Sequence, residues 1–135
     1  MRMDFALPVR VYWEDTDAGG VVFYANYLRF YERARTEWLR SLGIEQQKLR
    51  EQTGGMFVVT QAQVEYLRPA RLDDQLLVTA RLEASGRASM TIRQQAFLET
   101  TSGALLSEAS IRIGWVNGAN MRPMRIPISL LEQLS

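Results

Sequence analysis

Three carboxylates lie close together near the start of the chain, at Glu14, Asp15 and Asp17, and Gly19 and Gly20 follow them. An apolar segment with helical spacing begins a few residues later. A helix start presents unpaired backbone N–H groups and the positive end of the helix dipole, which can stabilise an oxyanion. A carboxylate one loop away can attack, or activate a water, at the same carbonyl carbon. The spacing therefore fits an acyl-transfer site, and it also fits acids that only cap a turn.

The overall composition is that of a globular protein. The chain has 135 residues, 47% hydrophobic and 23% charged, which predicts one domain over residues 1–135. Its 16 basic residues nearly balance its 15 acidic ones, for a net charge of +1. A nucleic-acid-binding protein usually shows a basic excess or stripe, so nucleic acid is not expected as a partner.

The sequence contains neither cysteine nor histidine. Disulfides, zinc–thiolate centres, cysteine nucleophiles and chemistry that needs an imidazole are therefore excluded. Residues 1–8 lack the apolar stretch of a signal peptide. No apolar run approaches the ~20 residues of a membrane-spanning helix, so no membrane span is predicted and the expected location is the cytoplasm.

The first half of the chain carries a helical pattern. A short strand is predicted at 9–13, and apolar residues at helical spacing predict a long helix over 25–42. Gly43 follows as a helix stop. Shorter helices are predicted over 45–52 and 128–134.

In the second half the hydrophobic period changes to two. Four alternating segments predict an antiparallel sheet with one buried face. Its first segment places five residues on one face: Val58, Thr60, Ala62, Val64 and Tyr66. The helix over 25–42 is the only long apolar element available to cover the sheet. The expected fold is therefore α+β, with about five strands curled around one central helix.

Three segments of the sequence resemble a known family. The segments VRVYWEDTDAGGVVFYANY (residues 9–27), FYERAR (30–35) and VEYLRPARLDD (64–74) are similar to the 4-hydroxybenzoyl-CoA thioesterase group of hotdog-fold proteins. Within that group, the likeness is greatest to the bacterial Tol–Pal-associated acyl-CoA thioesterases. The resemblance implies a curled antiparallel sheet around a long helix, in agreement with the pattern of hydrophobic residues.

The resemblance also assigns a catalytic pair. Asp17 takes the place of the family's catalytic aspartate, as nucleophile or general base. The backbone N–H of Tyr24 lies where the family polarises the thioester carbonyl. Many members of the Tol–Pal subfamily have histidine at position 24, so any role of an imidazole is lost here. Other members of the wider group have tyrosine at that position.

Coenzyme A carries phosphates, which arginine forks bind well. Candidate CoA-binding residues are Arg87 and Ser89 in one turn and Arg122 near the C-terminal end. Each such arginine also fits a solvated or cross-strand-paired surface residue. The resemblance places the pantetheine arm near Val58 and Val59. Gly19 and Gly20 would let a substrate approach the backbone closely.

Glu32 is the reserve catalytic residue, because some hotdog thioesterases use a glutamate on the helix. Its spacing to Arg35 also fits a structural ion pair, the simpler interpretation. The sequence thus implies hydrolysis of acyl-CoA with no metal and no redox cofactor.

Two other functions fit the same fold. One is a non-catalytic protein linked to envelope maintenance that binds acyl-CoA or acyl carrier protein. The other is a dehydratase, which is disfavoured because such enzymes rely on histidine. Unpaired sheet edges and the family likeness further predict a homodimer or homotetramer.

Overall fold

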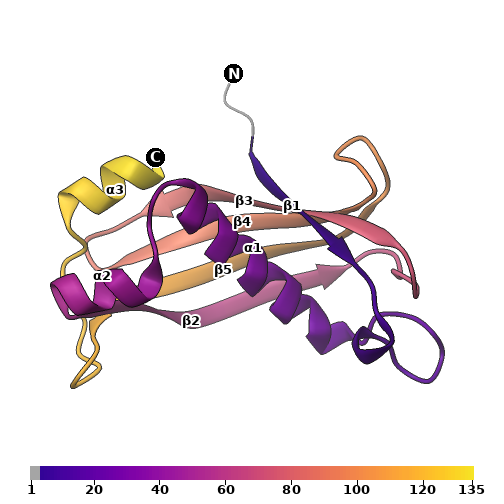
Figure 1. Cartoon of the computed structure of the whole chain (residues 1–135), viewed down its shortest axis with the longest axis horizontal. Coiled ribbons are helices and arrows are strands. Elements are labelled where there is room, and N and C mark those ends of the chain that lie inside the picture. The colour runs from indigo at the N-terminus through magenta and orange to yellow at the C-terminus, as the bar shows by residue number, and fades with distance from the viewer. Residues whose placement is uncertain (1–3) are drawn as a thin grey trace.

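The computed structural model describes residues 4–135. Five antiparallel strands form one sheet in the order β1-β3-β4-β5-β2, and a long helix lies across one of its faces (Figure 1). The strands are β1 (Phe5–Arg10), β2 (Gly55–Tyr66), β3 (Gln75–Ser85), β4 (Ser89–Leu98) and β5 (Leu105–Asn117). The helices are α1 (Tyr27–Ser41), α2 (Gln46–Thr53) and α3 (Ile128–Leu134), with 3-10 turns η1 (Trp13–Asp15) and η2 (Tyr24–Asn26). The predicted α+β architecture is confirmed.

Helix α1 forms the centre of the core. Phe30, Tyr31 and Ala34 on its inner side are fully buried, and they pack against the apolar side of the sheet. Each large side chain buried in this way contributes roughly 1.5–3 kcal/mol to folding. The helix ends before Gly43, whose φ of 81° is easy only for glycine, as the sequence predicted.

Two element boundaries differ from the sequence prediction. The first strand covers Phe5–Arg10 rather than 9–13, because the chain leaves the sheet at Val11 and turns through η1. The Asp15 carboxylate holds that turn by accepting a hydrogen bond from the Tyr12 N–H. The long helix covers Tyr27–Ser41 rather than 25–42, since η2 precedes it as a separate tighter turn.

A bulge in β2 places Val58 on the opposite face of the sheet from the one that the sequence predicted. Val59 pairs with Ile113 while Gln61 pairs with Arg112, so Thr60 is an extra residue and the alternation reverses there. The Phe57 ring accordingly packs on the Trp115 side of the sheet, with ring centroids 4.8 Å apart. The expectation that Val58 and Thr60 share the face of Ala62 is therefore wrong.

The strand order positions the functional region. Strand β2 is an edge strand, because it pairs with β5 on one side only. The end of β2 contacts the start of the long helix and the turn before it: the Tyr66 ring lies 5.5 Å from the Tyr27 ring and 6.0 Å from the Tyr24 ring, between ring centroids. Within residues 4–135, every helix is too short or too polar to cross a membrane.

Substituting Gly55 with alanine tests the packing at the start of β2. A methyl group at this position would overlap the buried Trp115 ring. We expect Gly55→Ala to lower the free energy of unfolding by about 1–3 kcal/mol in urea titrations. Gly86→Ala is the control, because its added methyl meets Ser89 only at an ordinary 3.7 Å and the change should stay within about 0.5 kcal/mol. Equal stability of the two variants would contradict this packing.

Candidate active site

A short hairpin presents the acidic segment. Thr16 and Val22 form an isolated antiparallel β-bridge. Two backbone hydrogen bonds of 2.9 Å support it, from the Asp17 N–H to the Val21 carbonyl and from the Phe23 N–H to the Asp15 carbonyl. The glycines at 19 and 20 form its tip, where Gly20 has a φ of 78°. The two glycines therefore shape the turn, and their predicted contact with substrate stays a prediction.

Asp17 lies at this tip and is exposed to solvent. Its Oδ1 atom accepts a hydrogen bond from the Gly19 N–H at 2.9 Å, while no group in residues 4–135 donates to its Oδ2 atom. One carboxylate oxygen is thus held in place and the other is available. Neither Asp17 nor Tyr24 lines any of the five main cavities of the described chain. A single chain therefore does not enclose this carboxylate.

Tyr24 opens the 3-10 turn that leads into α1. The backbone N–H groups of Tyr24 and Ala25 have no acceptor within residues 4–135, as expected at the start of a helical segment. The Tyr24 ring is 62% exposed and contacts Phe23 with ring centroids 4.8 Å apart. The hairpin thus carries an available carboxylate, and the 3-10 turn that follows it carries two available N–H donors.

Asp15 has a structural role that the sequence reading did not resolve. It is only 4% exposed, and its two oxygens accept hydrogen bonds from the Tyr12 N–H and the Asn26 side-chain amide, both at 2.8 Å. The predicted turn cap is correct, but the carboxylate is buried rather than solvated. It ties the base of the hairpin to the residue that precedes α1. Asn26, eleven positions away, gave no sequence signal of this contact.

A second region of interest is a cavity of about 160 Å³ between α1, α2 and the start of β2. It is lined by three residues that the sequence singled out, Glu32, Val58 and Val59. Arg35 lines it as well. The structure therefore gathers the reserve catalytic residue and the two candidate substrate-binding valines at one place, separate from Asp17.

The predicted ion pair between Glu32 and Arg35 is wrong. Neither residue forms an ion pair within the described chain. Glu32 instead accepts a hydrogen bond from the Thr36 hydroxyl at 3.3 Å. Arg35 turns inward and donates to the Oε1 atom of buried Gln94 at 2.9 Å. Burial lowers the pKa of Arg35, and the nearby Glu32 carboxylate offsets part of that shift.

Comparison with known proteins identifies the family. The model of the Thioesterase superfamily matches residues 19–104, which is well over half of the chain. The chain belongs to the thioesterase superfamily. The acyl-CoA thioesterase YbgC of Haemophilus influenzae is 42% identical to it over 91% of this chain and 88% of the relative. The acyl-CoA thioester hydrolase YbgC of Escherichia coli O6:H1 is 42% identical over 96% of this chain and 94% of the relative.

Solved structures agree with this assignment of the thioesterase chain. A hypothetical protein of Aquifex aeolicus superposes with a TM-score of 0.88 at 34% identity, covering 97% of this chain and 99% of that one. A probable thioesterase of Bartonella henselae superposes with a TM-score of 0.85 at 30% identity, and the superposition covers 93% of this chain and 100% of that one. The predicted hotdog fold is confirmed.

The candidate CoA-binding residues of this thioesterase lie at one end of the sheet. The Arg87 carbonyl accepts a hydrogen bond from the Ile126 N–H at 2.7 Å, and the Arg122 carbonyl accepts one from the Asn117 N–H at 2.9 Å. Both arginine side chains are exposed. These backbone contacts hold the turn with Arg87 and the C-terminal segment with Arg122 beside the start of β4 and the end of β5.

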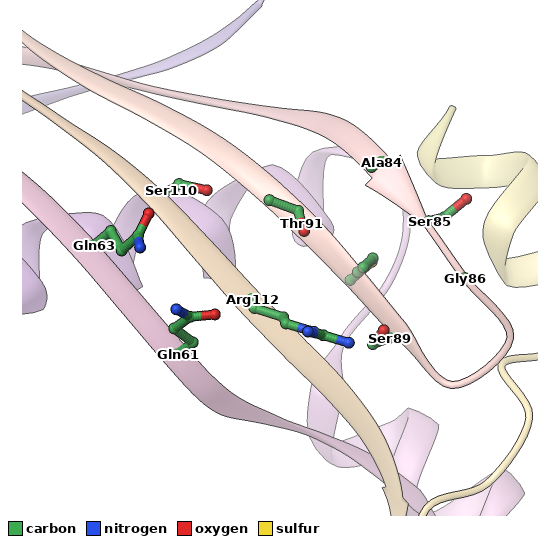
Figure 2. Close-up of a pocket in the computed structure, with 10 residues that line it drawn as sticks. Gln61, Gln63, Ala84, Ser85, Gly86, Ser89, Thr91, Ser110 and Arg112 are labelled. Atoms are coloured by element: carbon green, nitrogen blue, oxygen red, sulfur yellow. The ribbon is translucent and has the colours of Figure 1, made fainter.

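Ser89 lines a polar cavity of about 350 Å³ at the same end (Figure 2). Gln61, Gln63 and Arg112 line it as well, from β2 and β5. Arg112 is exposed and is thus available to an anionic ligand. Figure 2 shows that this cavity lies over the sheet, with α1 behind it.

The paired variants Asp15→Asn and Glu14→Gln separate the buried acid from its exposed neighbour. An amide at position 15 turns one acceptor oxygen into a donor that faces the Tyr12 N–H or the Asn26 amide. We expect Asp15→Asn to lower the free energy of unfolding by about 1–3 kcal/mol. Glu14→Gln changes an exposed side chain and should leave stability within about 0.5 kcal/mol. Urea titrations measure both, and an unchanged Asp15→Asn protein would exclude the anchoring role.

Proposed function

We propose that this thioesterase hydrolyses acyl-CoA to a free acid and coenzyme A. The observation that carries the proposal is a hairpin with an exposed carboxylate, Asp17, followed directly by the 3-10 turn η2, which carries the unpaired N–H groups of Tyr24 and Ala25. Relatives that are 42% identical over nearly the full chain are named as acyl-CoA thioester hydrolases, which supports the same substrate class.

The hairpin and the turn η2 together supply the two elements that thioester hydrolysis needs. The Tyr24 N–H, at the start of the helical segment, donates to the thioester oxygen and stabilises the negative charge that develops on it. Asp17 either attacks the carbonyl carbon or removes a proton from the attacking water. In either case the carbon–sulfur bond breaks and coenzyme A leaves as a thiolate that takes up a proton. If Asp17 attacks, the acyl group is left as a mixed anhydride on Asp17, and water then hydrolyses this anhydride to the free acid and the regenerated carboxylate. If Asp17 removes a proton from water, the oxygen of that water enters the free acid directly. No metal and no redox cofactor is used in this scheme.

Binding of coenzyme A follows from the positions of the other candidates. We assign its phosphates to Arg87 and Arg122, with Ser89 beside them, at one end of the sheet. The pantetheine arm would run along β2 at Val58 and Val59, and the backbone of the glycines at 19 and 20 would face the thioester. Forked guanidinium contacts to phosphate oxygens give both affinity and orientation.

The site is completed by a second copy of the chain. Strand β2 has one unpaired edge, and Val59 and Tyr66 along it are 51% and 46% exposed. Antiparallel pairing of two β2 edges places the start of one strand beside the end of the other. The hairpin of one chain, with the turn η2 that contacts Tyr66, would then face the cavity near Val59 of its partner. A homodimer is the smallest assembly with a complete site in this proposal, and a homotetramer would contain two such dimers.

A binding protein for acyl-CoA or acyl carrier protein is the alternative. It is favoured by one observation, the position of Asp17 outside the main cavities of the single chain. Release of free thiol from acyl-CoA separates the two functions. The link to the Tol–Pal system and to envelope maintenance stays a prediction.

Asp17→Asn tests the catalytic assignment. The asparagine oxygen can still accept the hydrogen bond from the Gly19 N–H, so the hairpin should keep its shape. We expect kcat for a panel of acyl-CoAs to fall by about 10²–10⁴-fold, the usual effect of losing a positioned acid–base group. Thiol trapping measures the rate.

Two matched variants complete that experiment. Glu14→Gln removes a neighbouring exposed carboxylate and should keep most of the activity. If Glu32→Gln abolishes turnover while Asp17→Asn does not, the catalytic role belongs to the reserve residue on the helix.

Light scattering tests the proposed dimer. The wild-type protein should have a mass of at least twice the 15.5 kDa of one chain. Val59→Lys places a charge at the edge of β2 and should shift the mass towards one chain, with loss of activity. Ile128→Lys is the control, because it changes an apolar residue of α3 that is 60% exposed. A wild-type protein that sediments and scatters as one chain would refute the shared site.

A further inference from the structure

The cavity between α1 and the start of β2 is small, and its lining combines apolar side chains with polar ones such as Thr36 and Gln46. Its walls include Trp38, Leu39, Phe57, Val59 and Ile113, and its volume is about 160 Å³. An engineered apolar cavity of about 150 Å³ in another protein holds benzene. The cavity therefore suits a short acyl group rather than a long chain.

One charged side chain is buried at this cavity. Arg35 is 9% exposed and lines the cavity. Its position is fixed by Gln94, which accepts a hydrogen bond from one guanidinium N–H and itself donates to the Tyr31 and Thr79 carbonyls at 3.0 and 3.2 Å. The guanidinium group has five N–H donors, and within residues 4–135 only this one hydrogen bond is formed.

The other donors of Arg35 face accessible space. Every fully buried side-chain nitrogen or oxygen in the described chain has a hydrogen-bond partner. The guanidinium nitrogens without a partner are therefore reachable from outside, and the cavity that Arg35 lines provides that access. Guanidinium N–H groups of Arg35 that have no acceptor in residues 4–135 therefore border this cavity.

The charge of Arg35 is also unpaired. Within residues 4–135 it forms no ion pair, and the Glu32 carboxylate at the same cavity is exposed and bonded by Thr36. An arginine stays protonated in proteins, and a buried cation without an anion costs free energy. A ligand that brings an anion into the cavity would recover part of that cost.

We propose that this cavity receives a short acyl group that ends in a carboxylate, and that Arg35 is the binding residue for that carboxylate. The planar guanidinium matches two carboxylate oxygens, while the apolar walls enclose the carbon chain between them and the thioester. A hydrocarbon acyl group of the same length would fill the space but leave the cation unpaired. This inference rests on the proposed thioesterase function, with Asp17 reaching the thioester from the partner chain.

A matched pair of substrates tests the proposal. Glutaryl-CoA and valeryl-CoA have the same five-carbon chain and differ in the terminal carboxylate. We expect kcat/KM of the wild-type protein to favour glutaryl-CoA by about 10- to 100-fold, the range for charge-assisted hydrogen bonds. In Arg35→Gln this ratio should fall towards one. Because both rates come from the same variant, the ratio is independent of how much of that variant is folded.

Arg33→Gln is the control for charge, since Arg33 is exposed on the same helix and does not line the cavity. It should keep the wild-type ratio. Equal use of the two substrates by the wild-type protein, or an unchanged ratio in Arg35→Gln, would overturn the proposal while leaving thioester hydrolysis intact.

Equilibrium binding of small acyl analogues separates the proposed function from the role of Arg35. If no acyl-CoA is hydrolysed, the proposed function fails, and isothermal titration of glutarate against valeramide decides the inference alone. Tighter binding of glutarate that is lost in Arg35→Gln would support a carboxylate receptor. Equal or undetectable binding of both would refute it.

Discussion

The burial of helix α1 against the sheet is the constraint on which the other features depend. Phe30, Tyr31 and Ala34 have no exposed surface, so the strands must curve to enclose them. Once the helix is fixed, its N-terminal end is fixed as well, beside the end of β2. The available N–H groups at Tyr24 thereby acquire a defined position, which a free loop could not give them.

Two aspartates in the same hairpin differ in burial and in hydrogen bonding. Asp15 is buried, and its two oxygens accept hydrogen bonds from the Tyr12 N–H and the Asn26 amide, which hold the base of the hairpin in place. Asp17, two residues later, is exposed and uses one oxygen to stabilise its own turn. A buried carboxylate with satisfied partners stabilises structure, whereas an exposed one with an available oxygen can react. Asp15 therefore anchors the hairpin that presents the exposed Asp17.

Two features are left incomplete in the single chain. Strand β2 presents an unpaired edge with exposed apolar side chains, and Arg35 presents unpaired donors at a cavity. Both lie along the same strand and the helix above it. An edge strand that pairs with a copy of itself and a cavity that admits an anion would each satisfy groups that the fold alone leaves without partners.

The sequence by itself determined the fold class and the central helix, because these depend on local periodicity and residue type. Helical spacing identified the helix to within two residues at each end, and the acids followed by two glycines indicated a turn near Asp17. The hairpin that contains this turn was not predicted. Only the tertiary structure decided which neighbours each residue has. It placed β2 at the edge, moved Val58 to the other face through the bulge at Thr60, and turned Arg35 away from Glu32 towards Gln94. These outcomes depend on contacts between residues up to about 60 positions apart, whose free energies compete with the local preferences that a sequence pattern reports.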